Sequence, residues 1–595
     1  MWGFFILIIT ISILNREIDT HHYLLYSLTM LYIYYIFYLI KTNLLHYINN
    51  MGALTLKSFP FELRGWEIEK FESIDPTDGF GSNTRVYINK DQIVLIEPDY
   101  NVNTFNTWLT DKGRQFFDGI FGTWKPNKTH KSLLKLEKES WTNILKTIMQ
   151  TIYIFDHCNA QKSIKHFFTI IFENLSIEIL SLLIIISQNY SFIKVRRAEQ
   201  IKLNNDLESH FQLNLASDKI KINSSNLCLL LATNTRYEGS YLNLTLRQRF
   251  FKGNFKCLAI GPITDLTFPI SFLGSNFNTF KTIVEGNHLA CNDIKLSKNP
   301  ILIYNSELFK RADGTNILKM LDVLQYSNIF NKSWNGLNML TPSLSETGTH
   351  QIANFLPITE KDLTNFSSLY FLNISPNNIA NFKRITETKL LNYFLNSKNI
   401  AISNRVFLNQ NSNFNNDNIL VSDINKLFLN TQNINNYFYL PNSMFYENEE
   451  TFINTEGLIK RTTKLISKKN NKNNWQILRK FLKKFKSNLQ LLDKKNNQVI
   501  YFNSKKISNF KNYIHFQYIA IQSFTNLNFY LSIKTKPFLI APKNNFKSKT
   551  NKLINTKLKY WLDDFFNGSK DEYSQNSLIL TNCSKIIRTE STNFF

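Results

Sequence analysis

Short apolar runs recur through the middle of the chain, and each is followed by a polar turn and then by residues with helical spacing. The segment Asn226–Arg236 is apolar as far as "LLLA" and ends in the polar "TNTR". Helical spacing follows at Tyr241–Lys252, and a second apolar run follows at Phe255–Gly261. Apolar strands separated by helices predict a mostly parallel sheet that is covered on both faces. The same pattern predicts three further strands and a helix, at Asn299–Ser306, Ser368–Asn378, Asn399–Asn404 and Thr315–Ser327.

Residues 52–124 show shorter patterns that are typical of strands and turns. The segment Arg85–Asp99 alternates between apolar and polar residues around a polar turn at Asn89–Asp91, which predicts a hairpin. A short helix is predicted within Asn106–Trp124. This part of the chain therefore differs from the strand–helix series that follows it.

Two segments after this region have helical or apolar character. Helical spacing is present at Lys138–Phe155. The segment Lys165–Ser187 is strongly apolar but contains Glu173 and Glu178. Because ionised carboxylates are costly inside a bilayer, these residues favour a buried helix or strand over a membrane span.

Residues 1–50 are more apolar than the rest of the chain. The segment Tyr23–Ile40 carries no charge and approaches the length of a membrane-spanning helix. It lacks the arginine-rich, amphipathic character of a cleavable presequence. The segment is either a membrane anchor or, if translation starts at Met51, the read-through of an A+T-rich spacer. The pattern leaves both interpretations open.

The chain has a net charge of +24, which raises the question of a nucleic-acid partner. The excess lysine lies in stretches that are also rich in asparagine, such as Ser467–Asn474 and Arg479–Asn488. Both residue types are what A+T-rich codons supply. We therefore interpret the charge as genome composition and predict no nucleic-acid partner.

The cysteines are widely scattered, and no two have the C-x-x-C spacing. Iron–sulfur clusters and structural zinc require closely spaced ligands. The sequence also lacks a G-x-G-x-x-G fingerprint after its apolar strands. We therefore predict no cofactor, no metal site and no catalytic residue in this chain. The cysteines are Cys158, Cys228, Cys257, Cys291 and Cys583.

The stretch Trp66–Lys90 concentrates carboxylates and glycines before a strand-like run. Asp75 and Asp78 could begin a calcium loop, but calcium needs six or more oxygen ligands and only these two carboxylates are in register. Gly79 and Gly81 are predicted to be turn positions with positive φ. Together with Glu72, these residues predict a polar turn between two strands.

Three other segments are weaker candidates for chemistry. His157 and Cys158 could form a nucleophile pair, but adjacent residues seldom face each other and no partner base is evident. Arg236 and Glu238 follow an apolar strand, which is where α/β folds place ligand-binding groups. The segment Thr451–Lys464 is a distinctive polar loop to which its pattern assigns no chemistry.

Several segments of particular sequence occur in order along the chain. They are "GALTLKSFPFELRGWEIEKFESIDPTDGFGSNTRVY", "WLTDKGRQFFDGI", "ESWTNIL", "LLLATNTRYEGSYLNLTLRQ", "LAIGPITDLTF", "KRADGTNIL", and "TFINTEGLIKRTTK" followed by "NWQILRKF". From about Gly52 to Phe481 the chain resembles the large iron–sulfur subunit of NADH–quinone oxidoreductase, which is respiratory complex I. The resemblance is to the C-terminal half of that subunit only. Thr235 stands where many relatives have proline, and Ser187–Asn214 matches poorly.

The resemblance implies an α/β molybdopterin-oxidoreductase-like fold, with a small N-terminal β-rich segment and several strand–helix units that form mostly parallel sheets. In this family the domain carries no molybdopterin and serves as a scaffold. We therefore expect a structural half of the subunit that supports electron transfer from NADH to quinone in the peripheral arm without catalysing it.

The resemblance also implies partners and a location. The family's ferredoxin-like half is missing, which implies a split subunit with the iron–sulfur clusters in a separate partner chain. Other complex I subunits are the remaining expected partners. The expected location is the matrix side of the mitochondrial inner membrane, reached through the complex or through residues 1–50.

Two hypotheses from other classes remain open. One is an active molybdopterin-dependent oxidoreductase, which would need pterin-binding loops and usually a serine or cysteine ligand to the metal. The other is a basic, membrane-anchored, RNA-associated protein.

For the organisation of the chain we predict an apolar leader (1–50), a β-rich segment (51–125), an α/β domain (126–480) and a basic region without a predicted element (481–595).

Overall fold

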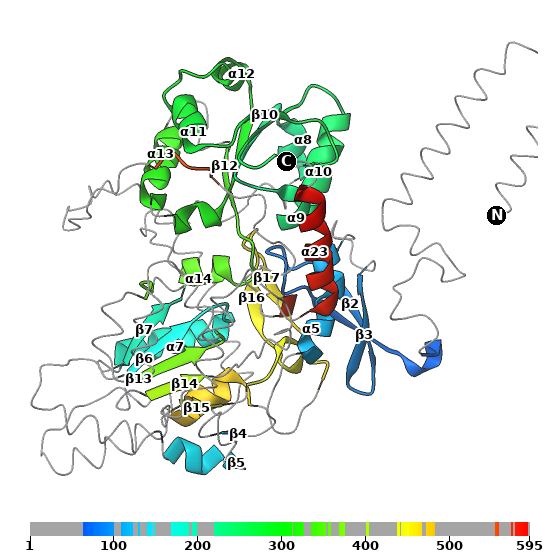
Figure 1. Cartoon of the computed structure of the whole chain (residues 1–595), viewed down its shortest axis with the longest axis vertical. Helices are drawn as coiled ribbons and strands as arrows, with labels where there is room; N and C mark the ends of the chain where they lie inside the picture. The colour runs from blue at the N-terminus through cyan, green and yellow to red at the C-terminus, as the bar shows by residue number, and fades with distance from the viewer. Residues whose placement is uncertain are drawn as a thin grey trace, which may run out of the picture. The chain divides into compact units, whose positions relative to one another are not determined.

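The computed structural model of the chain (Figure 1) describes residues 63–99, 109–122, 168–189, 193–198, 219–263, 265–311, 313–326, 336–352, 355–358, 368–374, 400–403, 437–440, 442–466, 472–481, 554–558 and 577–592, with the shorter pieces 129–130, 138–139, 141–146, 148, 334 and 573–574. The chain divides into two compact units, Met1–Glu69 and Lys70–Phe595. The described part of the first unit contains the 3-10 helix η1 (Gly65–Glu67) and the first residue of β1. All other elements belong to the second unit.

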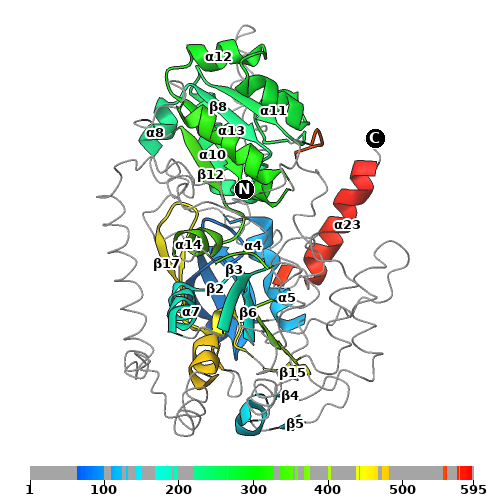
Figure 2. The same cartoon turned by 90° about the vertical axis from the view of Figure 1, so that its left-hand side faces the viewer.

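A five-stranded parallel sheet is built from residues 227–340, with the strand order β10-β9-β8-β11-β12. Alternate residues of β8 face two different cores. Leu229 and Leu231 pack in a cluster with residues of α11, α12 and α13, whereas Cys228 and Leu230 pack with residues of α8 and α10. Helices therefore cover both faces of the sheet (Figure 2), and this part of the fold prediction is confirmed. The elements are α8 (Lys219–Ser224), β8 (Leu227–Leu231), α9 (Thr235–Glu238), α10 (Ser240–Phe251), β9 (Lys256–Ile260), β10 (Ser271–Gly274), α11 (Phe277–Val284), α12 (Ala290–Leu296), β11 (Pro300–Asn305), η3 (Ser306–Lys310), α13 (Gly314–Tyr326) and β12 (Leu337–Leu340).

A second, seven-stranded sheet has the order β5-β4-β15-β14-β13-β6-β7. Its strands from β15 to β7 are parallel, and β4 and β5 add to it antiparallel. Glu173 directly follows β6 and Glu178 lies in the first turn of α7, and both are buried, which confirms the prediction of a buried helix or strand there. The elements are β4 (Thr129–His130), β5 (Lys138–Glu139), β6 (Phe168–Phe172), α7 (Ile177–Asn189), β7 (Ile193–Arg197), α14 (Glu346–Ile352), β13 (Ser368–Leu372), β14 (Ile400–Ser403) and β15 (Tyr437–Tyr439).

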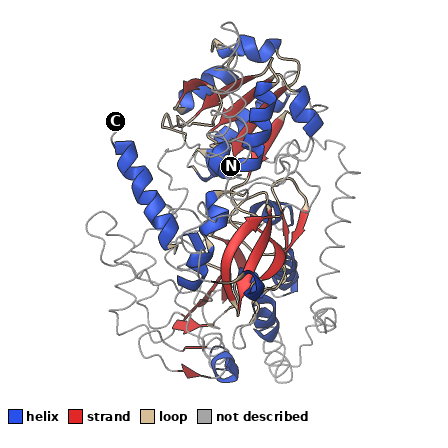
Figure 3. Cartoon of the chain, turned by 90° about the vertical axis from the view of Figure 1, so that its right-hand side faces the viewer, coloured by secondary structure: helices blue, strands red, loops and turns tan. Residues whose placement is uncertain are grey.

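A three-stranded antiparallel sheet of β1, β2 and β3 precedes the parallel sheets, and its long strands are the curved red ribbons of Figure 3. The hairpin β2–β3 confirms the prediction from its alternating pattern, with Lys90 and Asp91 at positive φ in the turn. A second hairpin, β16–β17, lies within the polar segment Thr451–Lys464. The elements are β1 (Glu69–Ile74), β2 (Asn83–Asn89), β3 (Gln92–Pro98), α4 (Asp111–Gln115), α5 (Phe117–Gly122), η4 (Phe445–Glu447), β16 (Thr451–Ile453) and β17 (Ile459–Arg461).

The region after residue 480 contains a helix that the sequence patterns did not predict. Helix α23 (Leu578–Thr592) buries Leu580 against Val86 of β2 and Phe116 after α4. Its sequence carries many Ser, Thr and Asn residues, which weaken a signal based on helix propensity. The sequence patterns predicted no particular element after residue 480, so α23 is an addition from the structure.

The described residues contain no helix that is long and apolar enough to cross a membrane. Residues 1–50, on which the anchor hypothesis depends, lie outside the described residues. Of the predicted helix at Lys138–Phe155, the structure describes 141–146 as helical.

Candidate functional site

The turn between β1 and β2 is closed by its own carboxylates. The backbone amide of Asp75 donates to the carbonyl of Ser82 over 2.9 Å. Asp75 Oδ1 accepts from the amide of Thr77 over 2.8 Å and from its hydroxyl over 2.7 Å. Asp78 accepts from the amide of Phe80 over 3.1 Å and from the Ser82 hydroxyl over 3.0 Å. The prediction of a polar turn between two strands is confirmed for Asp75 and Asp78, whereas Glu72 lies in β1 with an exposed side chain.

The two glycines of this turn have different roles. Gly81 has a φ of +57°, as predicted for a turn position. Gly79 is not among the residues with positive φ, so the prediction is wrong there. Instead, a Cβ atom on Gly79 would lie 1.9 Å from the carbonyl oxygen of Thr341, so glycine is needed for close backbone approach.

Burial changes the proton affinity of both carboxylates in the turn. Burial and the neighbouring charge of Asp78 raise the pKa of Asp75 to about 7. Burial raises the pKa of Asp78 to about 6, although hydrogen bonds and Lys112 oppose the shift. Oδ2 of Asp75 is buried without a hydrogen-bond partner among the described residues, and a Cβ atom on Gly113 would lie 2.0 Å from it. Helix α4 therefore packs directly on this carboxylate.

The carboxyl ends of β8 and β11 meet at the point where the strand order of the five-stranded sheet reverses, which is where open α/β sheets bind ligands. Glu238 lies at this point. Its Oε2 accepts from the amide of Asn234 over 3.1 Å and from Nδ2 of Asn305 over 2.8 Å, so it links the two strand ends. Arg236 instead pairs with Asp265 over 2.9 Å in an exposed position. The structure does not bring these two candidate residues together.

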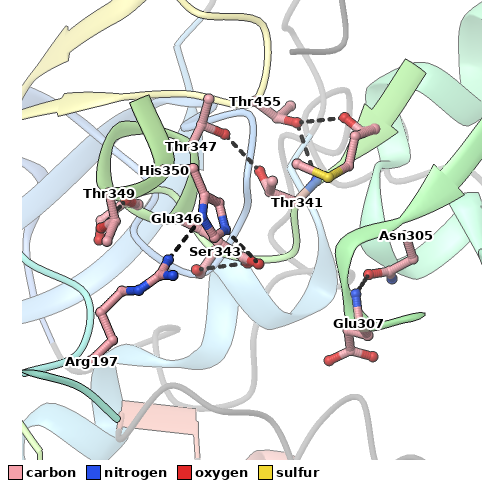
Figure 4. A network of polar contacts seen from close by, with 12 residues as sticks. Arg197, Asn305, Glu307, Thr341, Ser343, Glu346, Thr347, Thr349, His350 and Thr455 are labelled. Atoms are coloured by element: carbon pink, nitrogen blue, oxygen red, sulfur yellow. Dashed lines mark hydrogen bonds and ion pairs between the residues drawn. The ribbon is translucent and has the colours of Figure 1, made fainter. Parts of the chain in front are cut away.

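The segment that follows β12 carries a network of polar side chains (Figure 4). The Thr341 hydroxyl lies 3.1 Å from that of Thr347. The Thr341 amide donates over 3.2 Å to the hydroxyl of Thr455, in the turn of the β16–β17 hairpin. The Thr455 amide donates over 2.8 Å to the carbonyl of Gly79. The polar loop at Thr451–Lys464 thus ties the β1–β2 turn to the end of the five-stranded sheet.

The same network reaches the second parallel sheet through Arg197, the last residue of β7. Its Nε donates over 2.8 Å to the carbonyl of Phe355, and its Nη1 lies 2.9 Å from Nδ1 of His350. Because guanidinium can only donate, Nδ1 of His350 is the acceptor. His350 Nε2 lies 3.7 Å from Oε1 of Glu346, one turn earlier on α14. This chain of buried groups attaches α14 to the edge of the second sheet.

Replacing Arg197 by alanine is expected to destabilise the fold by about 2 to 4 kcal/mol, because the carbonyl of Phe355 and the His350 ring lose a buried donor. Denaturant unfolding followed by circular dichroism measures this loss. The Arg461→Ala variant is the control, since Arg461 forms an exposed pair with Glu449 that should contribute less than about 1 kcal/mol. Equal stability of both variants would contradict the structural role of Arg197.

Three further positions were singled out in the sequence, and the structure describes one of them. His157 and Cys158 lie outside the described residues. Thr235 is buried and donates from its hydroxyl to Oδ1 of Asn243 over 2.9 Å. The described residues contain no group of three or more His, Cys, Asp or Glu side chains placed to hold a metal ion.

Comparison with known families agrees with this architecture. The family model described as molybdopterin oxidoreductase matches residues 135–484, which is more than half of the chain. The chain therefore belongs to the molybdopterin oxidoreductase family. A second model, described as the 4Fe-4S domain of NADH-ubiquinone oxidoreductase NDSU1/NuoG-like proteins, matches residues 68–118.

Similar curated proteins are subunits of one respiratory enzyme. The chain is 26% identical over 441 residues to the NADH-ubiquinone oxidoreductase 75 kDa subunit of Reclinomonas americana, covering 72% of this chain and 59% of that protein. It is 24% identical to the mitochondrial NADH dehydrogenase iron-sulfur protein 1 of Solanum tuberosum, covering 54% of this chain and 43% of that protein. It is 27% identical to the mitochondrial NADH-ubiquinone oxidoreductase 78 kDa subunit of Neurospora crassa, covering 52% of this chain and 42% of that protein. The resemblance to the large iron–sulfur subunit of complex I is confirmed, and the chain spans less than two thirds of the length of these relatives.

One solved structure has a weaker likeness. A chain of the formyltransferase/hydrolase complex from Methylorubrum extorquens aligns with a TM-score of 0.35 and 6% identity, covering 58% of this chain and 95% of that chain. A likeness at this level carries no argument about fold or function.

The match at 68–118 corrects two expectations. The prediction that this chain contains no cofactor-binding part is wrong, because the matched segment belongs to a 4Fe-4S domain family. The resemblance therefore extends beyond the C-terminal half of the large subunit. The expectation of a separate partner chain that carries the iron–sulfur half is not supported. The cysteine count missed this domain because residues 68–118 contain no cysteine. The segment's own side chains thus supply no thiolate, and its residues do not fit the usual ligand set of a cluster.

The family name also implies a molybdopterin, whose fit can be tested at the carboxyl end of the five-stranded sheet. The polar side chains there bind one another, with Glu238 joining Asn234 to Asn305. Three buried hydroxyls near this edge, those of Thr233, Ser240 and Ser306, have no hydrogen-bond partner among the described residues, which leaves only small donors for a large, anionic group. The residues described at this edge do not fit a molybdopterin.

Proposed function

We propose that the chain is a structural component of an NADH–quinone oxidoreductase, where it supports electron transfer between NADH and quinone without itself reacting with either. The observation that carries this proposal is the ordered match of two family segments, 68–118 and 135–484, together with relatives that are named as subunits of that enzyme. The polar network between Gly79, Thr341 and Thr455 supports a scaffold role, because these buried groups serve to hold layers together.

The proposed location is the mitochondrion, in complex with the other subunits of the enzyme at the matrix side of the inner membrane. Relatives that are named as mitochondrial proteins support this location.

Mass spectrometry of the NADH-dehydrogenase band from a native gel of mitochondrial membranes tests the proposal. We expect peptides of this chain in that band, and loss of the assembled band when the chain is depleted. A normal amount of assembled enzyme without the chain would overturn the proposal. Stoichiometric molybdenum in the purified protein would instead favour an active molybdopterin enzyme.

A further inference from the structure

A short segment from the C-terminal region, Ile554–Leu558, lies against the five-stranded sheet. It is the orange-red stretch beside α11 and α13 in Figures 1 and 2. The amide of Phe277 donates to the carbonyl of Thr556, and the amide of Leu558 donates to the carbonyl of Ser275, each over 3.1 Å. These two hydrogen bonds flank an antiparallel bridge between residues 276 and 557. The segment therefore makes a single antiparallel bridge to the backbone that follows the edge strand β10. Its own first residues form a tight turn, in which the amide of Thr556 donates to the carbonyl of Ile554 over 2.9 Å.

Arg311 donates hydrogen bonds to the backbone of this segment. Its Nη1 donates to the carbonyl of Lys557 over 2.7 Å. Its Nη2 donates to the carbonyl of Ile554 over 3.3 Å and to the hydroxyl of Thr556 over 2.9 Å. One guanidinium thus reaches three acceptors, because its planar fork presents several donors in fixed directions.

Asp313 orients that guanidinium. Its Oδ1 accepts from Nε of Arg311 over 2.9 Å, and its Oδ2 accepts from Nη2 over 3.1 Å. Oδ2 also accepts from the amide of Ile554 over 3.3 Å. Only 1% of the Asp313 side chain is exposed, so the pair is held in place by its surroundings. Arg311 and Asp313 together bind donors and acceptors of the segment's backbone.

The segment is anchored by one apolar side chain. Leu558 is 5% exposed and packs in the core cluster that contains Phe277 and Phe280 of α11, whereas residues 554–557 are exposed. Burial of a leucine contributes about 1.5 to 3 kcal/mol. The contacts are therefore mostly with the backbone. Three side chains add selectivity: the carboxamide of Asn555, whose Oδ1 accepts from the amide of Asn278 over 3.3 Å, the hydroxyl of Thr556 and the apolar side chain of Leu558.

We propose that Arg311, Asp313 and the backbone of residues 275–278 form a binding site for a short peptide that begins in a tight turn, which the chain fills with its own Ile554–Leu558. The site takes peptides in which an asparagine is followed directly by a serine or threonine and, two residues after that, by an apolar residue. Because a tether keeps the local concentration of the segment high, the site is filled in cis, and Ile554–Leu558 then acts as a strap on the five-stranded sheet. This gives the "KRADG" motif, which precedes α13, a role apart from electron transfer.

Hydrogen–deuterium exchange of the full chain tests the strap in cis. In the Arg311→Ala and Leu558→Asp variants we expect peptides that cover residues 554–558 to exchange at least about 10-fold faster, which is the effect of losing about 1.4 kcal/mol of local stability. Peptides from β11 should keep their protection, which shows that the sheet is folded. Arg311→Lys, which keeps the charge but not the fork, should have an intermediate effect, and Arg461→Ala should have none. If exchange at 554–558 were unchanged in both Arg311→Ala and Leu558→Asp, the proposed binding of this segment in cis would be wrong.

A peptide supplied in trans tests the site itself. A synthetic peptide with the sequence of residues 552–560, "KLINTKLKY", should bind the full-length Leu558→Asp chain, whose own segment is displaced, and bind the wild type at least about 10-fold more weakly. Binding should be lost when Arg311→Ala is added to Leu558→Asp, and when the peptide carries alanine at the position of Leu558. The proposal would be overturned if the peptide did not bind the Leu558→Asp chain, or if it bound equally well after Arg311→Ala was added. Thr556→Val, an exposed change on the strap alone, should speed exchange of 554–558 without affecting the site.

Discussion

Replacing Gly79 by alanine is expected to lower the free energy of unfolding by about 3 kcal/mol or more. The added Cβ atom would lie 1.9 Å from the carbonyl oxygen of Thr341 and 3.0 Å from its carbonyl carbon. Both are backbone atoms, so no flexible side chain can move aside. The carbonyl of Gly79 also accepts from the amide of Thr455, so a shift of the turn would break a second contact.

Chemical unfolding of the purified chain measures this effect, and Gly65→Ala is the matched control. A Cβ atom on Gly65 would meet nothing within 4 Å, so that variant should differ from the wild type by less than about 0.5 kcal/mol. If Gly79→Ala were as stable as Gly65→Ala, the close approach of the turn to Thr341 would be wrong.

The Asp75→Asn variant is expected to change how stability depends on pH. The pKa of Asp75 is about 7 in the folded chain, because of burial and the charge of Asp78, against an ordinary value of 3.8. Between these values the folded chain holds a proton that the unfolded chain releases, so wild-type stability falls as pH rises. The contribution is fully present below pH 3.8 and is lost as pH rises through about 7.

The asparagine cannot ionise, yet its oxygen can still accept from the amide and hydroxyl of Thr77. From about pH 5 to about pH 8 the stability of the variant relative to the wild type should therefore rise by about 2 to 3 kcal/mol. The other groups facing this position, Asp78, Lys112 and Tyr446, are present in both chains.

Unfolding free energies at intervals of one unit between about pH 5 and about pH 8 test this prediction. Asp91→Asn is the control, because Asp91 is exposed in the β2–β3 turn, where asparagine tolerates positive φ. That variant should follow the wild type at every pH. Parallel curves for Asp75→Asn and the wild type would mean that Asp75 is not held protonated in the folded chain.

The strands and helices of the parallel sheets could largely be predicted from the sequence, because their apolar runs are continuous. Strand β8 and helix α10 lie at their predicted places in the chain. The short strand β12, with four residues, is too brief to produce a period of its own. A buried strand can be recognised from the sequence only when its run of apolar residues is long enough to stand out from its neighbours.

The candidate site was less predictable, because its contacts join residues that are far apart in sequence. The carboxylate turn at Asp75 and Asp78 could be foreseen from its composition. The bond between Thr341 and Thr455 spans 114 residues, and the pairing of Arg311 with Ile554 spans 243. Nothing local marks Gly79 as a contact of Thr341, so its lack of a side chain was assigned to turn geometry instead.

The hydrophobic core that α23 shares with the β2–β3 hairpin has a consequence for how the chain folds during synthesis. Val86 of the hairpin shares a core with Tyr573 and Leu580, which a ribosome adds almost 500 residues later. At about 5 to 20 residues per second, that interval lasts roughly 25 to 100 s. During this interval, the apolar face of the hairpin lacks the contacts that Tyr573 and Leu580 later supply. Nascent chains of this protein should therefore need a chaperone at their N-terminal sheet long after the α/β units have folded.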